Sequence, residues 1–425
     1  MKYCKRCLYP ENHPLYITFE EEGICSGCRI HEEKDSLDWT LRLQKLKNIL
    51  SGYQNQSGNN YDCIIPVSGA RDSYFIVHTI KNVMGMNPLL VTYNKQYNTA
   101  EGVRNLANLR IQFDCDIMTL TVNPETVKRI TRATLRNMGS MYWHCLAGQT
   151  VYPVQMAVKF KIPLIVWGAH QGIDQVGMFS HLDEVEMTRK YRKEHDLMGY
   201  EAEDLIDDFD GITEKDIVQF KYPDDKELER VGVRGIYLNN YIRWDSKAQH
   251  EEMIKKFGYK TSEQTRTFDT YNDVDCFNYS DVHDYIKFLK HGYSKVTDHA
   301  TREIRLRRMT REYGFELVKK FYNKKPKNLS LFLDWIGMTL NSFNYILDQH
   351  RNKDVWKRNE NWDWELKNDF LKEIEEAGDK NAALSSLEEF TSFQLTGKGL
   401  SSDMEGKYIL IGKGYFKEEK QEKVQ

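Results

Sequence analysis

The sequence predicts an α/β protein built on a doubly wound parallel sheet. Short apolar runs alternate with segments of helical periodicity between residues 61 and 168, as buried parallel strands and their crossover helices do. A loop of small residues, 68–73, follows the first apolar run and leads into a helix. Polar residues also follow the later strands, at the sheet edge where ligands of this fold class bind.

The composition narrows the function classes. The chain has 425 residues, 40% hydrophobic and 29% charged, with a formal net charge of −3. This length suffices for two or three domains with sizeable cores. The near-neutral charge argues against a dedicated nucleic-acid binder, and no apolar run approaches the ~20 residues that span a bilayer. The N-terminal residues lack the apolar stretch of a secretory signal. We therefore expect a cytoplasmic enzyme without nucleic-acid or membrane partners.

The N-terminal residues carry a four-cysteine motif. Cys4 and Cys7 form one C-x2-C pair, and Cys25 and Cys28 form a second pair after seventeen intervening residues. Four thiolates at this spacing complete a tetrahedral shell and predict a structural zinc ribbon, with a short strand over residues 16–20. Disulfide bonds and an iron–sulfur cluster are the alternatives. We expect the remaining cysteines to be small buried hydrophobes: Cys63, Cys115, Cys145 and Cys276.

The expected elements follow in chain order. A helix over 37–50 and a linker rich in Ser, Gly, Gln and Asn precede the sheet. The sheet region is predicted to contain strands at 64–67, 88–94, 116–122 and 162–168, with helices at 74–83, 99–111, 124–138 and 149–160. A further strand-like segment at 235–244 and a helix at 246–257 come next, followed by helices at 282–291, 297–308, 310–322 and later stretches to about residue 377. The segment 390–425 is expected to be peripheral or partly disordered.

These elements suggest a domain organisation of six parts. The acidic, irregular segment 176–235 shows no strand signal and is interpreted as an insertion that forms a lid or a substrate wall. The predicted parts are a zinc ribbon (1–36), a helix and linker (37–60), an ATP-binding domain (61–175), the acidic insertion (176–235), a substrate-side segment of the catalytic domain (236–322) and a helical extension with a tail (323–425).

The loop Ser68-Gly-Ala-Arg-Asp-Ser73 has the chemistry of a phosphate site. A strand, a tight loop and a helix N-terminus together present free N–H groups and the positive end of the helix dipole to an anion. The motif resembles the pyrophosphate loop of the PP-loop ATP pyrophosphatase superfamily. Ala70 stands where that family usually has a second glycine, and a positive φ there would cost about 1 kcal/mol. The alternative is an ordinary turn that caps a helix through Asp72 or Ser73.

Three blocks of sequence together resemble the N-acetyl sugar amidotransferases of bacterial surface-glycan biosynthesis, which are implicated in acetamidino sugars of O-antigen and of pseudaminic or legionaminic acid. The first block is the four-cysteine motif, and the second is the phosphate loop with its downstream segments at 85–92 and 104–108. The third is His283–Ala300, followed by Ile304-Arg305 and Thr310-Arg-Glu312. The likeness covers roughly residues 1–322.

The resemblance implies that ATP adenylylates the oxygen of a sugar acetamido group, and that ammonia then displaces AMP to leave an acetamidine. Asp72, Ser73, Asp298 and His299 are the implied catalytic residues, with His299 as general base. The implied ATP and Mg²⁺ contacts are Ser68, Gly69, Ala70, Arg71, Asp72, Ser73, Thr92, Tyr93, Asn94, Gly168, His170 and Asp174. The substrate is then an N-acetylated, nucleotide-linked sugar. No glutaminase motif is evident, so ammonia is expected from a separate glutaminase partner.

Two other readings remain open. A tRNA-thiolating PP-loop enzyme also fits a zinc ribbon, but it needs a basic RNA surface and a further cysteine set. A catalytically inactive PP-loop scaffold draws its support from Ala70 alone.

Overall fold

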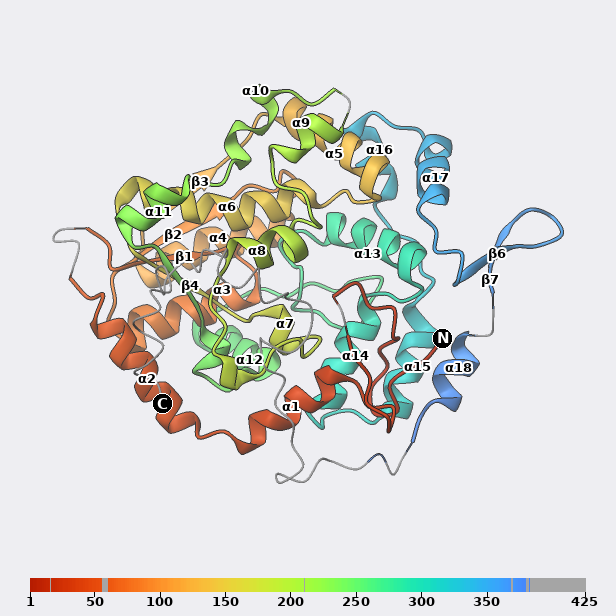
Figure 1. The fold of residues 1–425 in the computed structure, drawn as a ribbon, viewed down its shortest axis with the longest axis horizontal. Helices are drawn as coiled ribbons and strands as arrows, with labels where there is room; N and C mark the ends of the chain where they lie inside the picture. Colours follow the sequence, from red (N-terminus) through yellow and green to blue (C-terminus); the bar gives the residue numbers. More distant parts are fainter. Residues whose placement is uncertain (16, 56–59, 210, 368–369, 380–381, 383–425) are drawn as a thin grey trace.

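The computed structural model describes residues 1–425 except 16, 56–59, 210, 368–369, 380–381 and 383–425 (Figure 1). Its centre is a five-stranded parallel sheet with the strand order β3-β2-β1-β4-β5. The strands are β1 (Cys63–Pro66), β2 (Pro88–Tyr93), β3 (Ile117–Leu120), β4 (Leu164–Trp167) and β5 (Arg234–Tyr237). The predicted doubly wound α/β class is confirmed. The strand order reverses between β1 and β4, where ligands of such sheets bind beyond the carboxyl ends of the strands.

Helices cover both faces of the sheet, and the alternation of side chains along β1 shows the two layers. Ile65 packs with the helices α2 (Trp39–Ser51), α3 (Arg71–Val77), α4 (Ala100–Phe113) and α12 (Ser246–Phe257). Ile64 points the other way and packs with α6 (Trp143–Phe160) and α11 (Asp225–Val231). Both isoleucines are fully buried. An apolar run without polar alternation is therefore the expected sequence of this strand.

The helix predicted at 74–83 is present as an α-helix that continues directly into a π-helix. It begins with α3 and continues as the π-helical segment η1 (His78–Val83). The helix predicted at 149–160 begins at Trp143, six residues earlier than expected, and contains Pro153. The strand predicted at 16–20 was wrong: the described part of it contributes a single bridge between Phe19 and Cys25.

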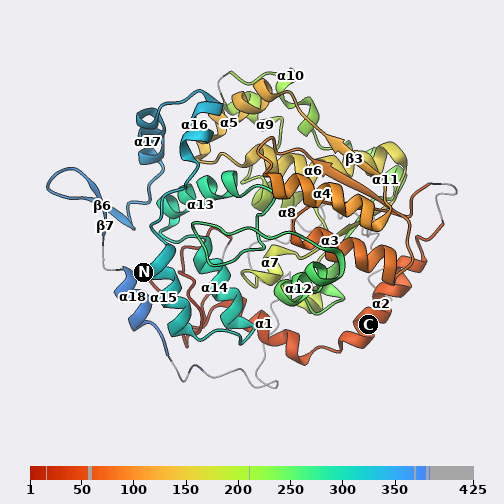
Figure 2. The same cartoon turned by 180° about the vertical axis from the view of Figure 1, so that it is seen from behind.

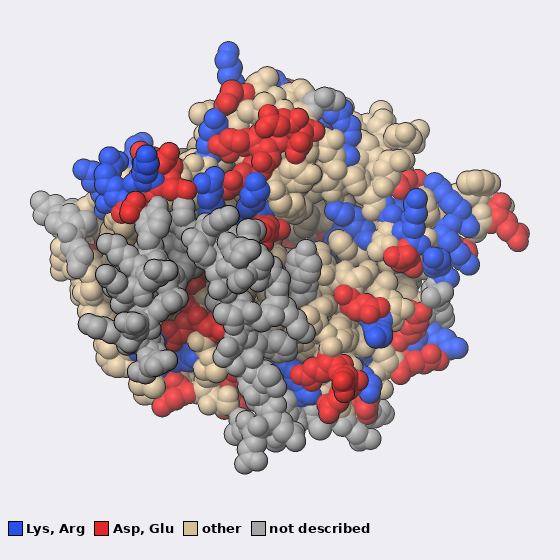
Figure 3. Space-filling view, viewed as in Figure 1, with Lys and Arg blue, Asp and Glu red and all other residues tan. Residues whose placement is uncertain are grey.

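The segment after β4 folds as short helical turns. The first two lie against α1 (Ser26–Ser36), and the later ones pack over α6 and α5 (Pro124–Met138). In chain order these are α7 (Gln171–Asp174), η2 (His181–Asp183), α8 (Arg189–Tyr191), η3 (Arg192–Asp196), α9 (Asp204–Asp208), α10 (Glu214–Ile217) and η4 (Val218–Phe220), before α11. Acidic side chains gather on the surface over α9 and α10 (Figure 3). After β5, the chain turns through η5 (Leu238–Asn240).

The region after α12 is mainly helical, as predicted. It contains α13 (Phe277–His291), α14 (Lys295–Arg305), α15 (Arg311–Phe321), α16 (Leu329–Ile336), α17 (Leu340–Gln349) and α18 (Phe370–Glu376). An antiparallel hairpin of β6 (Trp356–Arg358) and β7 (Trp364–Leu366) interrupts it, where helices were expected. The hairpin projects from the molecule in both views (Figures 1 and 2). The prediction for residues 390–425 lies outside the described residues.

The cysteine-rich N-terminus packs against α14 and α15, from the other end of the chain (Figure 2). Tyr3 and Leu8 share a buried apolar cluster with Val296 and Phe315. From this contact, α1 (Ser26–Ser36) runs towards the carboxyl edge of the sheet, and α2 continues beneath the sheet region. Among the described helices, none is long and apolar enough to cross a membrane.

Candidate functional site

The loop after β1 closes on itself through its two serines. The Ser73 hydroxyl accepts a hydrogen bond from the Ser68 N–H at 3.1 Å, and the Ser68 hydroxyl accepts one from the Ala70 N–H at 3.2 Å. Gly69 has a φ of +78°, and a Cβ built there would lie 2.9 Å from the Cβ of Leu106. A side chain at this position would therefore be opposed both by backbone strain and by α4.

Ala70 does not carry the strain that the missing second glycine suggested. Its φ is −81° and its ψ is 177°, which is extended backbone at the N-cap of α3. The left-handed conformation falls on Gly69 instead. The departure from the family pattern is thus compatible with an intact loop.

Two carboxylates from different elements lie near each other at this edge of the sheet. Asp72 is in the first turn of α3, and Asp174 ends α7 just beyond β4. Burial and the neighbouring Asp174 carboxylate raise the pKa of Asp72, against the effect of the Arg71 guanidinium, which lies 3.5 Å from the Asp72 Oδ2 atom. Two like charges at one site are the arrangement that a divalent cation neutralises.

Asp174 is also held by the helix that follows the cysteines. Its carboxylate accepts a hydrogen bond from the ammonium of Lys34, and its main-chain oxygen accepts one from His31 Nε2 at 3.0 Å. Although burial favours the neutral acid, Lys34 and His31 hold the pKa of Asp174 well below its usual range. The carboxylate is therefore ionised throughout the physiological range.

The opposite side of the loop faces α14 and the segment before α13. Arg302 donates to the Asp269 carboxylate at 2.7 Å. The guanidinium carbons of Arg302 and Arg71 lie 5.1 and 5.8 Å from the centre of the Tyr271 ring, and His250 stacks on that ring at 4.6 Å. Because Arg71 of the loop and Arg302 of α14 lie against the same Tyr271 ring, this cluster borders the phosphate loop.

Several buried polar atoms of this cluster have no hydrogen-bond partner within the described part of the chain. They are Arg71 Nη1, both ring nitrogens of His250 and the hydroxyl of Tyr271. Burial lowers the pKa of His250 to about 3, so its ring is neutral. Polar atoms in this condition are satisfied by a ligand or by water, so the border between the loop and the α14 cluster is a candidate binding surface.

His299, the predicted general base, lies in the same cluster. Its Nδ1 atom is 2.7 Å from the Thr267 hydroxyl, and its Nε2 atom is 3.3 Å from the Asn272 amide. Burial lowers the pKa of His299 to about 4 against the effect of Asp269. The ring is neutral at pH 7 and can accept a proton, but only after it gives up its bond to Asn272.

Asp298 points to a different partner from its neighbour in sequence. Its carboxylate accepts hydrogen bonds from the Tyr9 hydroxyl at 2.9 Å and from the Gln175 amide at 3.3 Å, and it pairs with Lys287 at 2.5 Å. These partners link α14 to the cysteine-rich segment and to α7. In this structure, Asp298 therefore connects three elements through its hydrogen bonds. Its contact with the sugar stays a prediction.

The structure places the side chains of two predicted ligand contacts, His170 and Tyr93, in packed surroundings. The His170 ring lies between the rings of Tyr191 and Tyr237, with centres 4.2 and 4.6 Å away, and not against the phosphate loop. The Tyr93 ring packs in the cluster of α5 and α6, where its hydroxyl meets His144 at 3.0 Å. Both strand faces are covered by helices, so a position on a strand does not by itself expose a side chain to the ligand edge.

The remaining predicted contacts lie at the ends of β2 and β4. Thr92 is buried within β2. Asn94 follows the strand and bonds Thr121 at 3.3 Å. Gly168 follows β4, where a Cβ would lie 3.0 Å from Ile76 of α3, so α3 packs closely against this strand end.

The four predicted metal ligands converge. The sulfur atoms of Cys4, Cys7, Cys25 and Cys28 all lie within 4.8 Å of one another and are buried. The Cys4–Cys28 and Cys7–Cys25 sulfur distances are 3.9 and 3.6 Å, close to the edge of about 3.8 Å that a tetrahedron with Zn–S bonds of about 2.3 Å requires. All eight cysteines of the chain carry free thiols. The donor set and its geometry therefore fit a tetrahedral ion such as zinc.

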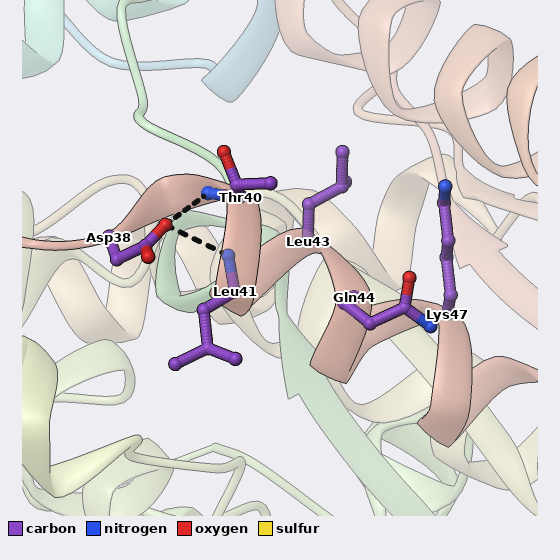
Figure 4. A pocket seen from close by; sticks show the side chains of 6 residues that line it. All are labelled: Asp38, Thr40, Leu41, Leu43, Gln44 and Lys47. Carbon is purple, nitrogen blue, oxygen red and sulfur yellow. Dashed lines mark hydrogen bonds between the residues drawn. The ribbon is translucent and has the colours of Figure 1, made fainter.

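A hollow of about 380 Å³ on the exposed side of α2 is separate from this site. Its lining side chains spread apart along one helix, and Asp38 caps that helix through the N–H groups of Thr40 and Leu41 at 2.9 and 3.0 Å (Figure 4). None of its lining residues belongs to the phosphate loop or the α14 cluster: Asp38, Thr40, Leu41, Leu43, Gln44 and Lys47.

The residues that sequence reasoning missed lie mostly outside recognisable motifs. Lys34, His250, Asp269, Tyr271 and Arg302 all border the site, yet the sequence around each looks like a charged or polar helix or loop. Their proximity to the loop arises from the fold. Arg302 alone had a signal, because it follows the third block by two residues.

Comparison with known proteins gives one family match. Residues 248–369 match the family described as "LPS biosynthesis protein WbpG-like, C-terminal domain", which fits the resemblance carried by the three sequence blocks. No curated protein matches the chain. Among solved structures, NMN synthetase from Francisella tularensis resembles the chain with 14% sequence identity and a TM-score of 0.27, over 54% of this chain and 98% of that one.

Proposed function

We propose that this chain is a PP-loop enzyme of bacterial surface-glycan biosynthesis, an ATP-dependent amidotransferase that converts a sugar acetamido group to an acetamidino group. The observation that carries the proposal is the border between the phosphate loop and the α14 cluster. The loop supplies Arg71 and Asp72, and residues 248–369, the part that matches the WbpG-like family, supply His250, Tyr271 and Arg302.

In the proposed reaction, the acetamido oxygen attacks the α-phosphorus of ATP and pyrophosphate leaves. Ammonia then adds to the activated carbon, and AMP leaves as the C–O bond breaks. An amide oxygen is a poor leaving group, and adenylylation makes it a good one. Ser68, Gly69 and Ser73 shape the loop, the N–H groups at the start of α3 face the pyrophosphate, and Arg71 adds a charge-assisted contact.

Mg²⁺ fits this site because it offers two carboxylates beside the phosphate loop: Asp72 in the first turn of α3, and Asp174, which is near enough to raise the pKa of Asp72. Oxygen ligands of this kind are those that Mg²⁺ prefers. The ion would neutralise phosphate charge during adenylyl transfer. In the four-cysteine cluster, a zinc ion would serve folding, because four thiolates leave it no open position.

Ammonia is proposed to come from a separate glutaminase partner. A glutaminase needs a reactive thiolate, and Cys145, the one candidate that the sequence offered, is fully buried. Burial raises the pKa of Cys145 well above that of an ordinary thiol. This supports a protein that receives ammonia and does not make it. His299 is the proposed acceptor of the ammonia proton.

The test is to incubate the purified chain with Mg-ATP, ammonium and a panel of free and nucleotide-linked N-acetyl sugars, and to measure products by mass spectrometry. The expected product is a sugar in which one O is replaced by NH, formed together with AMP. A parallel reaction with glutamine in place of ammonium should give no amidine until a glutaminase is added. Amidine from glutamine and the chain alone would contradict the partner proposal.

The same assay separates the two alternatives. AMP without a modified sugar would favour a PP-loop enzyme acting on RNA, and RNA copurifying with the chain would strengthen that reading. No AMP and no ATP–pyrophosphate exchange would favour an inactive scaffold. The unstrained Ala70 removes the observation on which the scaffold reading depended.

A further inference from the structure

We propose that Lys34 is a positioning residue that holds the Asp174 carboxylate at the carboxyl edge of the sheet, so that the four-cysteine segment builds one wall of the ATP–metal site. This inference rests on the proposed function, which gives Asp174 its role towards Mg²⁺. It goes further by assigning a part in that site to α1, a helix that begins directly after a cysteine of the metal cluster.

The position of Lys34 is unusual for its residue type. Only 1% of its side chain is exposed, although lysine is rarely buried in proteins unless it is paired. Its ammonium donates to Asp174 Oδ1, and it lies 3.4 Å from the main-chain oxygen of Trp244. A buried ammonium with one carboxylate and one carbonyl as partners is fixed in direction, and it fixes the carboxylate in turn.

The rest of α1 anchors the same loop through the main chain. The Ser26 hydroxyl donates to the main-chain oxygen of Val176 at 2.6 Å, and His31 donates to that of Asp174 at 3.0 Å. A Cβ at Gly177 would lie 2.4 Å from the main-chain oxygen of Ser26. The backbone on both sides of Gln175 is thus seated on α1, so the helix positions the loop as well as the carboxylate.

A second link runs from the metal cluster itself. Arg305 Nη2 lies 3.3 Å from the Cys25 sulfur, and Arg305 Nη1 donates to the main-chain oxygen of Gln175 at 2.5 Å. Gly27 makes this approach possible, because a Cβ there would fall 2.2 Å from Arg305 Nη2 and 2.7 Å from that oxygen. Arg305 therefore contacts both the four-cysteine cluster and the loop that carries Asp174.

Electrostatics explains why a lysine beside Asp174 would be useful. The Asp174 carboxylate is close enough to Asp72 to raise the pKa of that residue. Without Lys34, Asp174 would keep only the neighbouring His31 ring as a side-chain partner, and its partly buried negative charge would cost free energy through desolvation and repulsion. Lys34 lets the metal meet an ionised carboxylate that is already oriented.

The experiment measures Mn²⁺ binding by electron paramagnetic resonance in the presence of α,β-methylene-ATP, which lacks the bond that the enzyme would break. The full-length variants are Lys34→Met, Lys34→Arg and the control Lys45→Met. Lys45 lies on α2 and pairs with Glu184, but half of its side chain is exposed. Zinc content is measured on every variant, and nucleotide binding without metal is measured in parallel.

We expect Lys34→Met to weaken Mn²⁺ binding at least about tenfold, which corresponds to about 1.4 kcal/mol. Zinc content and metal-free nucleotide binding should stay unchanged. Lys34→Arg should recover part of the affinity, and Lys45→Met should match the wild type. A second variant, Asp174→Asn, should weaken Mn²⁺ binding similarly, and adding Lys34→Met to it should have little further effect, because both act on one pair.

Equal or tighter Mn²⁺ binding by Lys34→Met would overturn the inference while leaving the proposed function standing. Loss of zinc and of metal-free nucleotide binding together with Mn²⁺ binding would also overturn it, because Lys34 would then act only through folding. Failure of the wild-type chain to bind the nucleotide at all would overturn the proposed function, and the inference with it.

Discussion

The Arg302 guanidinium lies 2.7 Å from the Asp269 carboxylate, and this contact joins the last turn of α14 to the segment that precedes α13. The Asp269 side chain is fully enclosed and also accepts hydrogen bonds from the N–H groups of Tyr271 and Asn272, both at 2.9 Å. One carboxylate thus fixes both the cation and the aromatic ring that border the phosphate loop.

Replacing this carboxylate should therefore be costly. We expect Asp269→Asn to lower the free energy of unfolding by about 3 kcal/mol, because it removes the fully buried carboxylate of the pair and leaves Arg302 with Glu303 as its remaining acidic partner. Guanidinium denaturation followed by circular dichroism measures the change. The matched control is Glu252→Gln, which breaks the exposed pair with Lys256 on α12 and should cost less than about 0.5 kcal/mol. Equal effects of the two variants would contradict the prediction.

Gly69 and Ala70 should respond in opposite ways to substitution. Gly69→Ala places a Cβ at a positive φ and against Leu106, so we expect the ATP concentration for half-maximal ATP–pyrophosphate exchange to rise about tenfold, from a strain of about 1–2 kcal/mol. Ala70→Gly restores the family pattern at a position with extended backbone and should leave that concentration unchanged. A large gain of activity in Ala70→Gly would show that the loop geometry is wrong.

The stability of the protein should fall in mild acid. Burial lowers the pKa values of seven histidines to about 3 or 4, namely His144, His170, His195, His250, His283, His291 and His299. The unfolded chain binds their protons near pH 6.5, so it binds more protons than the folded chain between about pH 6.5 and 4. The free energy of unfolding therefore rises with pH in that window.

A single substitution isolates this effect. His250→Gln removes one such group, and we expect the slope of unfolding free energy against pH between about 6 and 5 to decrease by up to about 1.4 kcal/mol per pH unit. Urea denaturation at four pH values measures it. An unchanged slope would mean that His250 is protonated in the folded state.

The four-cysteine cluster should bind one zinc ion per chain. We expect Cys25→Ser to lose the metal and to lower the melting temperature, because a structural zinc ion contributes directly to folding. The control Cys115→Ser alters a partly buried thiol outside the cluster and should keep the metal. Elemental analysis of the purified variants decides between these outcomes. Iron and labile sulfide in place of zinc would establish the iron–sulfur alternative.

Much of the fold could be predicted because local patterns determine it. The apolar runs at β1, β2 and β4 have both faces buried, so their sequence shows their place in a parallel sheet. The four-cysteine cluster could be predicted for a similar reason, because the spacing within each C-x2-C pair is a local pattern that is typical of a shared metal ion. The helix α12 ends at Phe257, where Gly258 adopts a positive φ of 66°, and its bounds were predicted correctly.

The hairpin of β6 and β7 could not be predicted in the same way. Its strands have three residues each, too short for a period of two to be recognised, and Arg351 packs against the rings of Trp356 and Trp364 at 4.8 and 5.3 Å. Such packing between side chains leaves no periodic trace in the sequence.

The candidate site was predictable only in part. The phosphate loop is a contiguous motif, whereas Lys34 and Asp174 are 140 residues apart. Lys34 also belongs to the run His31-Glu-Glu-Lys-Asp35, which has the composition of a solvated helix face although Glu33 and Lys34 are buried. Tyr93 illustrates the opposite case, because it was predicted to contact the ligand from a strand end and the structure places its ring in a buried cluster.

The approach of Gly27 to Arg305 and Gln175 means that the cysteine segment is not a removable module, even though its motif is that of an independent small domain. Cutting the chain before residue 37 would strip the partners from Asp174 and Arg305 and uncover the apolar side chains that Leu8 now covers on α14 and α15. A shortened chain that starts after the cysteine segment would therefore lack the side chains that hold the Asp174 loop in place.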